Sequence, residues 1–234
     1  MSARVYAGAR RLLRPVKALY ERLAKPKRSL AEWTSYWDEQ AAGVEDEREA
    51  NGYAVGPDEY RERFLAPYLE LLELEPQHAV LDVGCGTGLL LYEFEQRAGR
   101  VVGADASPAM LARYEGGAEV VVAPAHDLPF PAGSFDRISM INIAQYFPST
   151  TYLEQVIRHL FGLLREDGIL VVGAVLVKPP SRLSPYPWIS RERLVRLAEG
   201  FGCYFSLLAP PAVYRDSRVH ERCDLVVYRG APGA

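Results

Sequence analysis

The chain has 234 residues, 49% of them apolar and 24% charged, so it is long enough to bury one domain core. No apolar run approaches the roughly 20 residues of a membrane-spanning helix, and no signal peptide is recognisable. The three cysteines show no C-x-x-C pair and no metal-ligand spacing with the four histidines. We therefore expect a globular, cytoplasmic protein with core thiols and no metal.

Charge is unevenly distributed along the chain. Residues 1–28 hold nine arginines and lysines against one glutamate, so they carry +8 and the remaining residues carry −11. Apolar residues recur at spacings of four and three from Val5 to Leu23, which predicts a basic amphipathic helix with a kink at Pro15. Such a helix fits the inner surface of an anionic membrane, but it equally fits a protein surface or an unpacked arm.

Residues 29–56 form a segment that is first aromatic and then charged. Trp33, Tyr36 and Trp37 stand close together in it, and core packing is one interpretation because aromatic residues usually serve burial. The next stretch, 57–76, has apolar residues at helical spacing. We expect a helix there with Asp58 as its N-cap.

Residues 79–91 contain the central motif. A short apolar run predicts a buried strand, which stops at Gly84, Gly86 and Gly88 before an apolar run that predicts a helix. A glycine turn between strand and helix lets a ligand lie against the backbone, with its polar end at the first N–H groups of the helix. A dinucleotide site is disfavoured, because G-x-G-x-x-G would need glycine at the position of Leu89.

Residues 100–105 predict a second strand that ends in Asp105. Ser107 and Pro108 then suit the cap and the first residue of a helix. An acidic residue about 20 positions after a glycine loop suits the two hydroxyls of a ribose. By themselves these patterns indicate a nucleotide-like ligand at the ends of two strands.

Two segments resemble the class I S-adenosylmethionine (SAM) dependent methyltransferases. Asp82, Gly84, Gly86 and Gly88 match the D-x-G-x-G-x-G pattern of motif I. Residues 125–136 are similar to the A-x-D-L-P-F-P-x-x-S-F-D segment of the group that includes quinone C-methyltransferases and many small-molecule enzymes. The resemblance covers roughly residues 57–175 and implies SAM as the cofactor.

The resemblance also implies roles for individual residues. Asp105 would bind the ribose and Asp127 the adenine amino group, with His126 and Leu128 lining the ring. The implied cofactor-binding set is Asp82, Gly84, Cys85, Gly86, Gly88, Asp105, Ala106, His126, Asp127, Leu128 and Asn142. An arginine at position 61 or 63 would reach the SAM carboxylate or lie on a solvated helix face. In small methyltransferases an N-terminal aromatic segment folds over the cofactor, and the candidates for this cover are Tyr36, Trp37, Tyr53 and Tyr60.

The acceptor side is expected in two loops. Residues 142–148 leave the carboxyl end of a strand predicted at 136–141, where ligands of open α/β sheets bind. Asn142 is not followed by the P-P-Y of base-directed amino methyltransferases. Residues 178–188 form a loop rich in proline and aromatic residues. The candidate substrate-binding residues are Tyr146, Tyr186 and Trp188; His220, Tyr146 and Asp216 are considered as bases, but none is assigned a catalytic role.

The remaining elements complete an α/β pattern. Further strands are predicted at 119–123, 169–177, 201–208 and 223–228, with helices at 151–166 and from Ser190. Thr151 and Glu154 fit a capping box for the first of these helices. The family resemblance implies a seven-stranded, mostly parallel sheet with helices on both faces and the last strand antiparallel.

The predicted function is methyl transfer from SAM to a small-molecule or lipid-linked acceptor by in-line displacement, leaving S-adenosylhomocysteine. The alternative is a non-catalytic SAM-binding regulatory or scaffold subunit that docks a partner through its N-terminal helix. Nucleic acid is disfavoured as a partner because the body is acidic. The expected division is an arm at 1–28 with peripheral membrane contact as one role, an aromatic cover at 29–56, and a methyltransferase domain at 57–234.

Overall fold

The computed structural model describes residues 28–53, 56–178, 186–211 and 221–230. The predicted basic helix, most of the loop at 178–188, and the residues Asp216 and His220 lie outside these ranges.

A single sheet of seven strands forms the centre of the described chain, in the order β3-β2-β1-β4-β5-β7-β6. The strands are β1 (Ala79–Val83), β2 (Arg100–Asp105), β3 (Glu119–Val122), β4 (Phe135–Ile141), β5 (Leu164–Lys178), β6 (Tyr204–Leu208) and β7 (Glu221–Tyr228). Neighbours from β3 to β5 pair in parallel, whereas β7 is antiparallel to both β5 and β6. The predicted sheet, with its last strand antiparallel, is confirmed.

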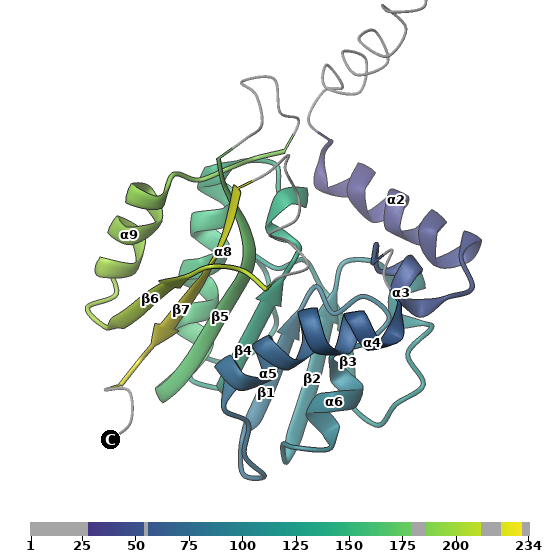
Figure 1. Cartoon of the computed structure of the whole chain (residues 1–234), viewed down its shortest axis with the longest axis horizontal. Coiled ribbons are helices and arrows are strands. Elements are labelled where there is room, and N and C mark those ends of the chain that lie inside the picture. Colours follow the sequence, from purple (N-terminus) through teal and green to yellow (C-terminus); the bar gives the residue numbers. More distant parts are fainter. Residues whose placement is uncertain (1–27, 54–55, 179–185, 212–220, 231–234) are drawn as a thin grey trace, which may run out of the picture.

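Helices cover both faces of the sheet. They are α2 (Leu30–Gly43), α3 (Glu47–Ala50), α4 (Pro57–Tyr60), the π-helix η1 (Arg61–Leu65), α5 (Ala66–Leu72), α6 (Leu91–Glu95), α7 (Pro108–Leu111), the 3-10 helix η2 (Ala144–Tyr146), α8 (Thr150–Leu163) and α9 (Arg191–Glu199). Figure 1 shows α4 and α5 in front of the sheet, α8 behind it, and α2 across the upper ends of the parallel strands. Two apolar clusters, one on each face, form the core.

The central strands have the composition that a doubly covered sheet requires. All five residues of β1 are buried, and β5 is buried without interruption from Gly168 to Val177. Parallel strands flanked by helices on both faces need continuous apolar runs rather than alternating ones. This is why the short valine-rich run at 79–83 is recognisable in the sequence.

The helix predicted at 57–76 begins and ends at other residues than expected. Its N-cap is Gly56, with Pro57 as the first helical residue, so Asp58 lies in the first turn and does not cap. It passes through the π-helical turn η1 into α5 and stops at Leu72, because Glu73 adopts a left-handed conformation with φ of 46°. Pro76 therefore lies beyond the helix end.

Other predicted boundaries also shift. Ser149 caps α8 by accepting a hydrogen bond from the backbone N–H of Tyr152 (3.1 Å), so the capping box predicted at Thr151 and Glu154 is wrong. Glu154 instead accepts from Arg193 Nη2 of α9 (3.0 Å). The helix after the glycine loop is only the five-residue α6. Strand β5 begins at Leu164 and contains the expected turn at 166–168, whereas β6 begins at Tyr204 and β7 at Glu221.

Candidate functional site

The glycine loop between β1 and α6 turns over the end of β2. The backbone N–H groups of Gly84 and Cys85 donate to the carbonyl of Ala104 at 2.7 and 3.2 Å. Gly84 and Gly86 both have positive φ, and a Cβ at Gly84 would lie 2.6 Å from Ile143 Cγ2. A side chain at either position would strain the backbone and fill the space above the loop.

Asp105, the last residue of β2, faces this loop. Its two carboxylate oxygens accept hydrogen bonds from the backbone N–H groups of Gly86 and Ser107, each at 2.9 Å. Burial raises the pKa of Asp105, while these N–H groups oppose the shift and Asp38 adds to it. The loop and the acid are thus joined into one polar rim at the carboxyl ends of β1 and β2.

Two adjoining cavities lie over this rim. The larger, of about 150 Å³, and the smaller, of about 60 Å³, share Trp37, Gly84, Asp105, Ile143 and Tyr146 in their walls. The larger continues over Ala106 and Ala123–Ala125 to Phe147 and Tyr152, and the smaller continues over Gly86 to Asn51, Tyr53 and Asn142. We call the two together the cleft. Its position at the carboxyl ends of parallel strands is where ligands of open α/β sheets bind.

Aromatic rings from α2 form the roof of the cleft. Trp33 and Trp37 each meet the ring of Tyr146 edge-on, with centroids 4.7 and 5.2 Å apart. Tyr186 stacks on Trp33 at 6.4 Å, and Tyr36 contacts both tryptophans. Such pairs add about 0.5–1.5 kcal/mol to burial. The roof thus contacts the loop after β4 directly.

Polar contacts dock α2 onto the body of the domain. Asp38 accepts from the Ser107 hydroxyl at 2.6 Å, beside the rim. Arg113 donates to the carbonyls of Ala41 (2.9 Å), in the last turn of the helix, and of Val44 and Glu45 (2.7 Å), which follow it. These contacts satisfy backbone groups that a helix end leaves open.

Asn51 reaches from the end of α3 onto the glycine loop. Its side-chain amide donates to Thr87 Oγ1 at 2.6 Å and accepts from the backbone N–H of Thr87 at 3.3 Å. A Cβ at Gly86 would lie 1.9 Å from Asn51 Oδ1. The segment 29–53 therefore touches the cleft at both the larger cavity and the glycine loop.

Five of the predicted cofactor residues line the cleft: Gly84, Gly86, Asp105, Ala106 and Asn142. Three others lie beneath or beside the loop. Asp82 is buried and accepts from the Ser139 hydroxyl at 2.7 Å, Cys85 is buried against the core, and Gly88 packs on the ring of Tyr114.

The segment expected to hold adenine lies at the margin of the larger cavity. Asp127 and His126 are exposed, and His126 Nδ1 is 2.7 Å from the hydroxyl of the cavity-lining Tyr152. Leu128 is buried in the core, and its backbone N–H donates to His159 Nε2 at 3.3 Å. None of these three is among the residues that line the cleft.

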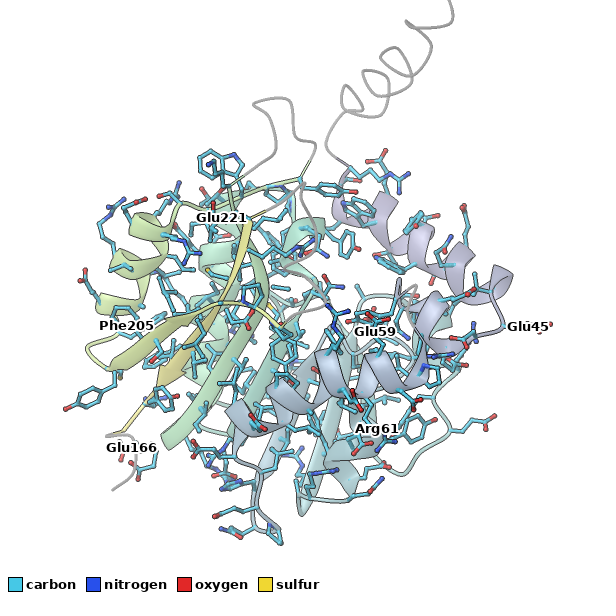
Figure 2. The ribbon with its side chains drawn as sticks, viewed as in Figure 1. Glu45, Glu59, Arg61, Glu166, Phe205 and Glu221 are labelled. Atoms are coloured by element: carbon cyan, nitrogen blue, oxygen red, sulfur yellow. The ribbon has the colours of Figure 1, made fainter. Side chains whose placement is uncertain are left out.

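The three residues predicted to bind the acceptor do not all lie in the cleft. Tyr146 lines both cavities and Tyr186 joins the roof, but Trp188 is 45% exposed, and its carbonyl accepts from the Thr150 hydroxyl. Of the predicted cover, Trp37 and Tyr53 line the cleft, Tyr36 packs behind Trp33, and Tyr60 is buried in the core. Arg61 pairs with Glu93 and Arg63 with Glu59, and neither arginine lines the cleft. Figure 2 labels Arg61 and Glu59 in front of the sheet.

The sequence prediction misses several residues that shape the cleft, among them Asp38, Asn51, Arg113 and Ile143. The Asn51-Gly52 pair marks a turn, and Gly52 does have a positive φ, but a turn signal does not say what the side chain contacts. Within the described ranges no His, Cys, Asp and Glu side chains cluster as a metal site would require. No helix among those residues is long and apolar enough to span a membrane.

Comparison with known proteins agrees with this geometry. Residues 81–172 match the family model described as a methyltransferase domain. Nocamycin O-methyltransferase of Saccharothrix syringae is 36% identical over 181 residues, which are 71% of this chain and 59% of that protein. The 18S rRNA (guanine(1575)-N(7))-methyltransferase of Saccharomyces cerevisiae is 34% identical over 44% of this chain and 42% of that protein. The chain thus covers less than two thirds of either relative.

A solved structure has the same fold. Phosphoethanolamine N-methyltransferase 1 of Haemonchus contortus, in complex with phosphoethanolamine and S-adenosylhomocysteine, superposes with a TM-score of 0.68 over 85% of this chain and 48% of that one, at 14% identity.

The cleft has the features that SAM requires. A side chain at Gly84 or Gly86 would fill the space over the loop, the carboxylate of Asp105 lies at the rim, and apolar and aromatic walls enclose the larger cavity. The matched region runs from Leu81 in β1 to Val172 in β5, so this part of the chain is a methyltransferase domain, with the fold of the solved methyltransferase structure and a cleft that fits SAM as the cofactor.

Proposed function

We propose that this protein transfers the methyl group of SAM to a small-molecule acceptor that binds under the aromatic roof of α2. The observation that carries the proposal is that the larger cavity is lined both by Gly84 and Asp105 of the polar rim and by the rings of Trp33, Trp37 and Tyr146. Cofactor and acceptor would thus share one enclosed space.

The chain's residues would bind and orient both partners. The Asp105 carboxylate would accept the ribose hydroxyls, and the space over Gly84 and Gly86 would take the polar amino-acid end of the cofactor. The bound cofactor supplies an electrophilic methyl group on a sulfonium. Holding the partners in near-attack geometry and excluding water contribute most to such a displacement, and the roof of α2 provides both.

No described residue of the cleft is assigned as a base. Burial raises the pKa of Tyr146, and a hydrogen bond with Gln145 only partly opposes this. The phenol is therefore protonated at neutral pH and serves as a hydrogen-bond partner and a wall rather than as a proton acceptor.

The size and chemistry of the cleft support a small acceptor of apolar or aromatic character. Its larger cavity is lined mostly by apolar and aromatic side chains. Nocamycin O-methyltransferase, the relative that matches 71% of this chain, is named for a small-molecule product, whereas the rRNA enzyme matches 44%. The excess negative charge of residues 29–234 also disfavours nucleic acid.

Mass spectrometry of matched organic and aqueous extracts, from cells with and without this protein, tests the proposal. We expect one methylated species to depend on the protein, and purified protein with the corresponding unmethylated fraction to convert SAM to S-adenosylhomocysteine. Dependence in the organic phase identifies a lipid-linked or quinone-like acceptor, and dependence in the aqueous phase a soluble metabolite. SAM binding without turnover in either fraction would favour the non-catalytic alternative.

A further inference from the structure

A polar network lies behind the loop that follows β4. Arg222, on β7, places Nη1 within hydrogen-bond distance of Ala174 O (2.8 Å), Gln145 Oε1 (3.1 Å) and Asn142 Oδ1 (3.4 Å). Gln145 Nε2 donates in turn to Asn142 O and Oδ1, at 2.7 and 3.0 Å. One guanidinium thus connects β7, β5 and the loop that lines the cleft.

Two residues of this network have unusual backbone conformations. Asn142 and Ala174 are both left-handed, with φ of 59° and 58°. Such conformations are costly for residues other than glycine and persist where surrounding contacts impose them. Arg222 contacts both residues, through the Asn142 side chain and through the Ala174 carbonyl.

The strain at Ala174 is built into the sheet. The pairing of β5 with β7 shifts register between Val172 and Val175, so Ala174 lies in a bulge. Its N–H donates to the buried Asp224 at 2.7 Å, and the hydroxyl of Tyr68 donates to the same carboxylate oxygen at 3.2 Å. The bulge is therefore held from both sides, by Asp224 at its N–H and by Arg222 at its carbonyl.

The loop fixed by this network supplies three walls of the cleft. Asn142, Ile143 and Tyr146 line the smaller cavity, and Tyr146 also meets the roof of α2. Arg222 itself lines neither cavity. Its influence on a bound ligand would therefore act through the loop.

We propose that Arg222 is a positioning residue, which holds Asn142 and Tyr146 in the conformation that the cofactor requires. Cofactor affinity then depends on a side chain that does not touch the cofactor. The inference rests on the proposed function, since it assumes that the cleft holds SAM and its product.

Calorimetric binding of S-adenosylhomocysteine to the full chain tests this role. Arg222→Met should weaken binding about tenfold, because it removes the hydrogen bonds that hold the loop, and Gln145→Ala about threefold, because it removes only part of the network. Arg222→Lys should recover part of the loss because it keeps the charge.

Arg229 provides the matched control. It directly follows Tyr228, the last residue of β7, and also donates to backbone carbonyls, those of Phe161 and Leu164, but at the opposite end of the strand from Arg222. In Figure 2, Glu221 labels the start of β7, and Glu166 of β5 lies near its other end. Arg229→Met should change affinity by less than about twofold, as expected for a site with no shared partners.

Equal affinity of the unaltered chain and Arg222→Met would overturn the inference. If Arg222→Met does not fold, the affinity of Gln145→Ala tests the inference in its place. Unchanged affinity in that variant overturns the inference as well. Lack of binding by the unaltered chain would instead overturn the proposed function, and this inference with it. A loss in Arg229→Met as large as in Arg222→Met, at matched thermal unfolding, would show general destabilisation and also contradict the positioning role.

Discussion

Asp105 combines two tasks that are usually separate. Its carboxylate organises the protein, by accepting from Gly86 and Ser107, and it also lines both cavities. Burial raises the pKa of this group, and the N–H donors oppose that shift because they stabilise the charged form. A ligand with two hydroxyl groups would complete the carboxylate's unused acceptor positions.

Asp105→Ala should therefore weaken SAM binding by about ten- to a hundredfold, because hydrogen bonds to a charged group contribute about 1.5–3 kcal/mol. Calorimetry with SAM measures the change. Glu166→Ala, an exposed position far from the cleft, is the control and should bind normally. Unchanged affinity in Asp105→Ala would remove the ribose assignment.

Asp82 lies directly below the glycine loop, and the protonation of its carboxyl group makes the stability of the fold depend on pH. Burial raises its pKa to about 7, and the nearby charge of Asp105 adds to the shift against the Ser139 hydrogen bond. The folded protein therefore binds a proton here that the unfolded chain has already released above its ordinary pKa near 4. Stability from this group is present at low pH and is lost as pH rises towards 7.

Asp82→Asn should remove this pH dependence while keeping an acceptor for Ser139. We expect the variant to gain stability relative to the unaltered protein between pH 5 and pH 8, as measured by urea unfolding at both values. The exposed Glu166→Gln should show no such difference. A constant difference in unfolding free energy at the two pH values would contradict the raised pKa.

At the scale of secondary structure, α2 is a stable roof because its ends are fixed separately. Ser29 and Glu32 form a capping box at its start, with Glu32 accepting from the Ser29 N–H at 2.7 Å. Arg113 donates to carbonyls in and just after its last turn, and Asp38 joins its middle to the N-cap of α7. The sequence indicates an aromatic segment here, but these three contacts decide where its rings lie.

Helix α8 provides a test of how caps are identified. Ser149→Ala should cost about 1 kcal/mol of unfolding free energy, because Ser149 accepts the N–H of Tyr152 at the first turn. Thr151→Ala should cost less than about 0.5 kcal/mol, since Thr151 is exposed in that turn. Urea unfolding compares the two variants. A larger loss in Thr151→Ala would restore the capping box suggested by the sequence.

At the scale of the whole molecule, the basic arm and the acidic body are separate electrostatic units. Residues 1–28 carry +8, and each basic residue near an anionic bilayer adds about 1 kcal/mol to binding. Helix α2, which follows this arm, begins with its own capping box. The arm is thus proposed as a peripheral membrane contact.

Deletion of residues 1–26 should abolish co-sedimentation with anionic vesicles and leave the unfolding temperature unchanged. Neutral phosphatidylcholine vesicles serve as the control and should not retain the full chain. Unaltered binding of the shortened chain to anionic vesicles would contradict a lipid-binding arm and favour a protein contact.

The sequence alone determined the order of the strands and main helices and a nucleotide-like site, while the resemblance to known methyltransferases supplied the cofactor. These features rest on local patterns: valine-rich runs such as 79–83, the glycines at 84, 86 and 88, and an acid at the end of the next strand. Each pattern reflects a requirement of nearby backbone, namely burial on both faces or a positive φ at a turn. Such requirements are visible in a single stretch of chain.

Only the tertiary structure decided which side chains meet in the cleft. Asn51 reaches Thr87 across 36 positions, and Arg222 reaches Asn142 across 80. The tertiary structure also shows that Tyr146 lines the cleft, whereas Trp188, which was predicted to bind the acceptor with it, is exposed. These outcomes depend on how distant elements pack, because burial and hydrogen bonding between remote residues leave no periodic trace in the sequence.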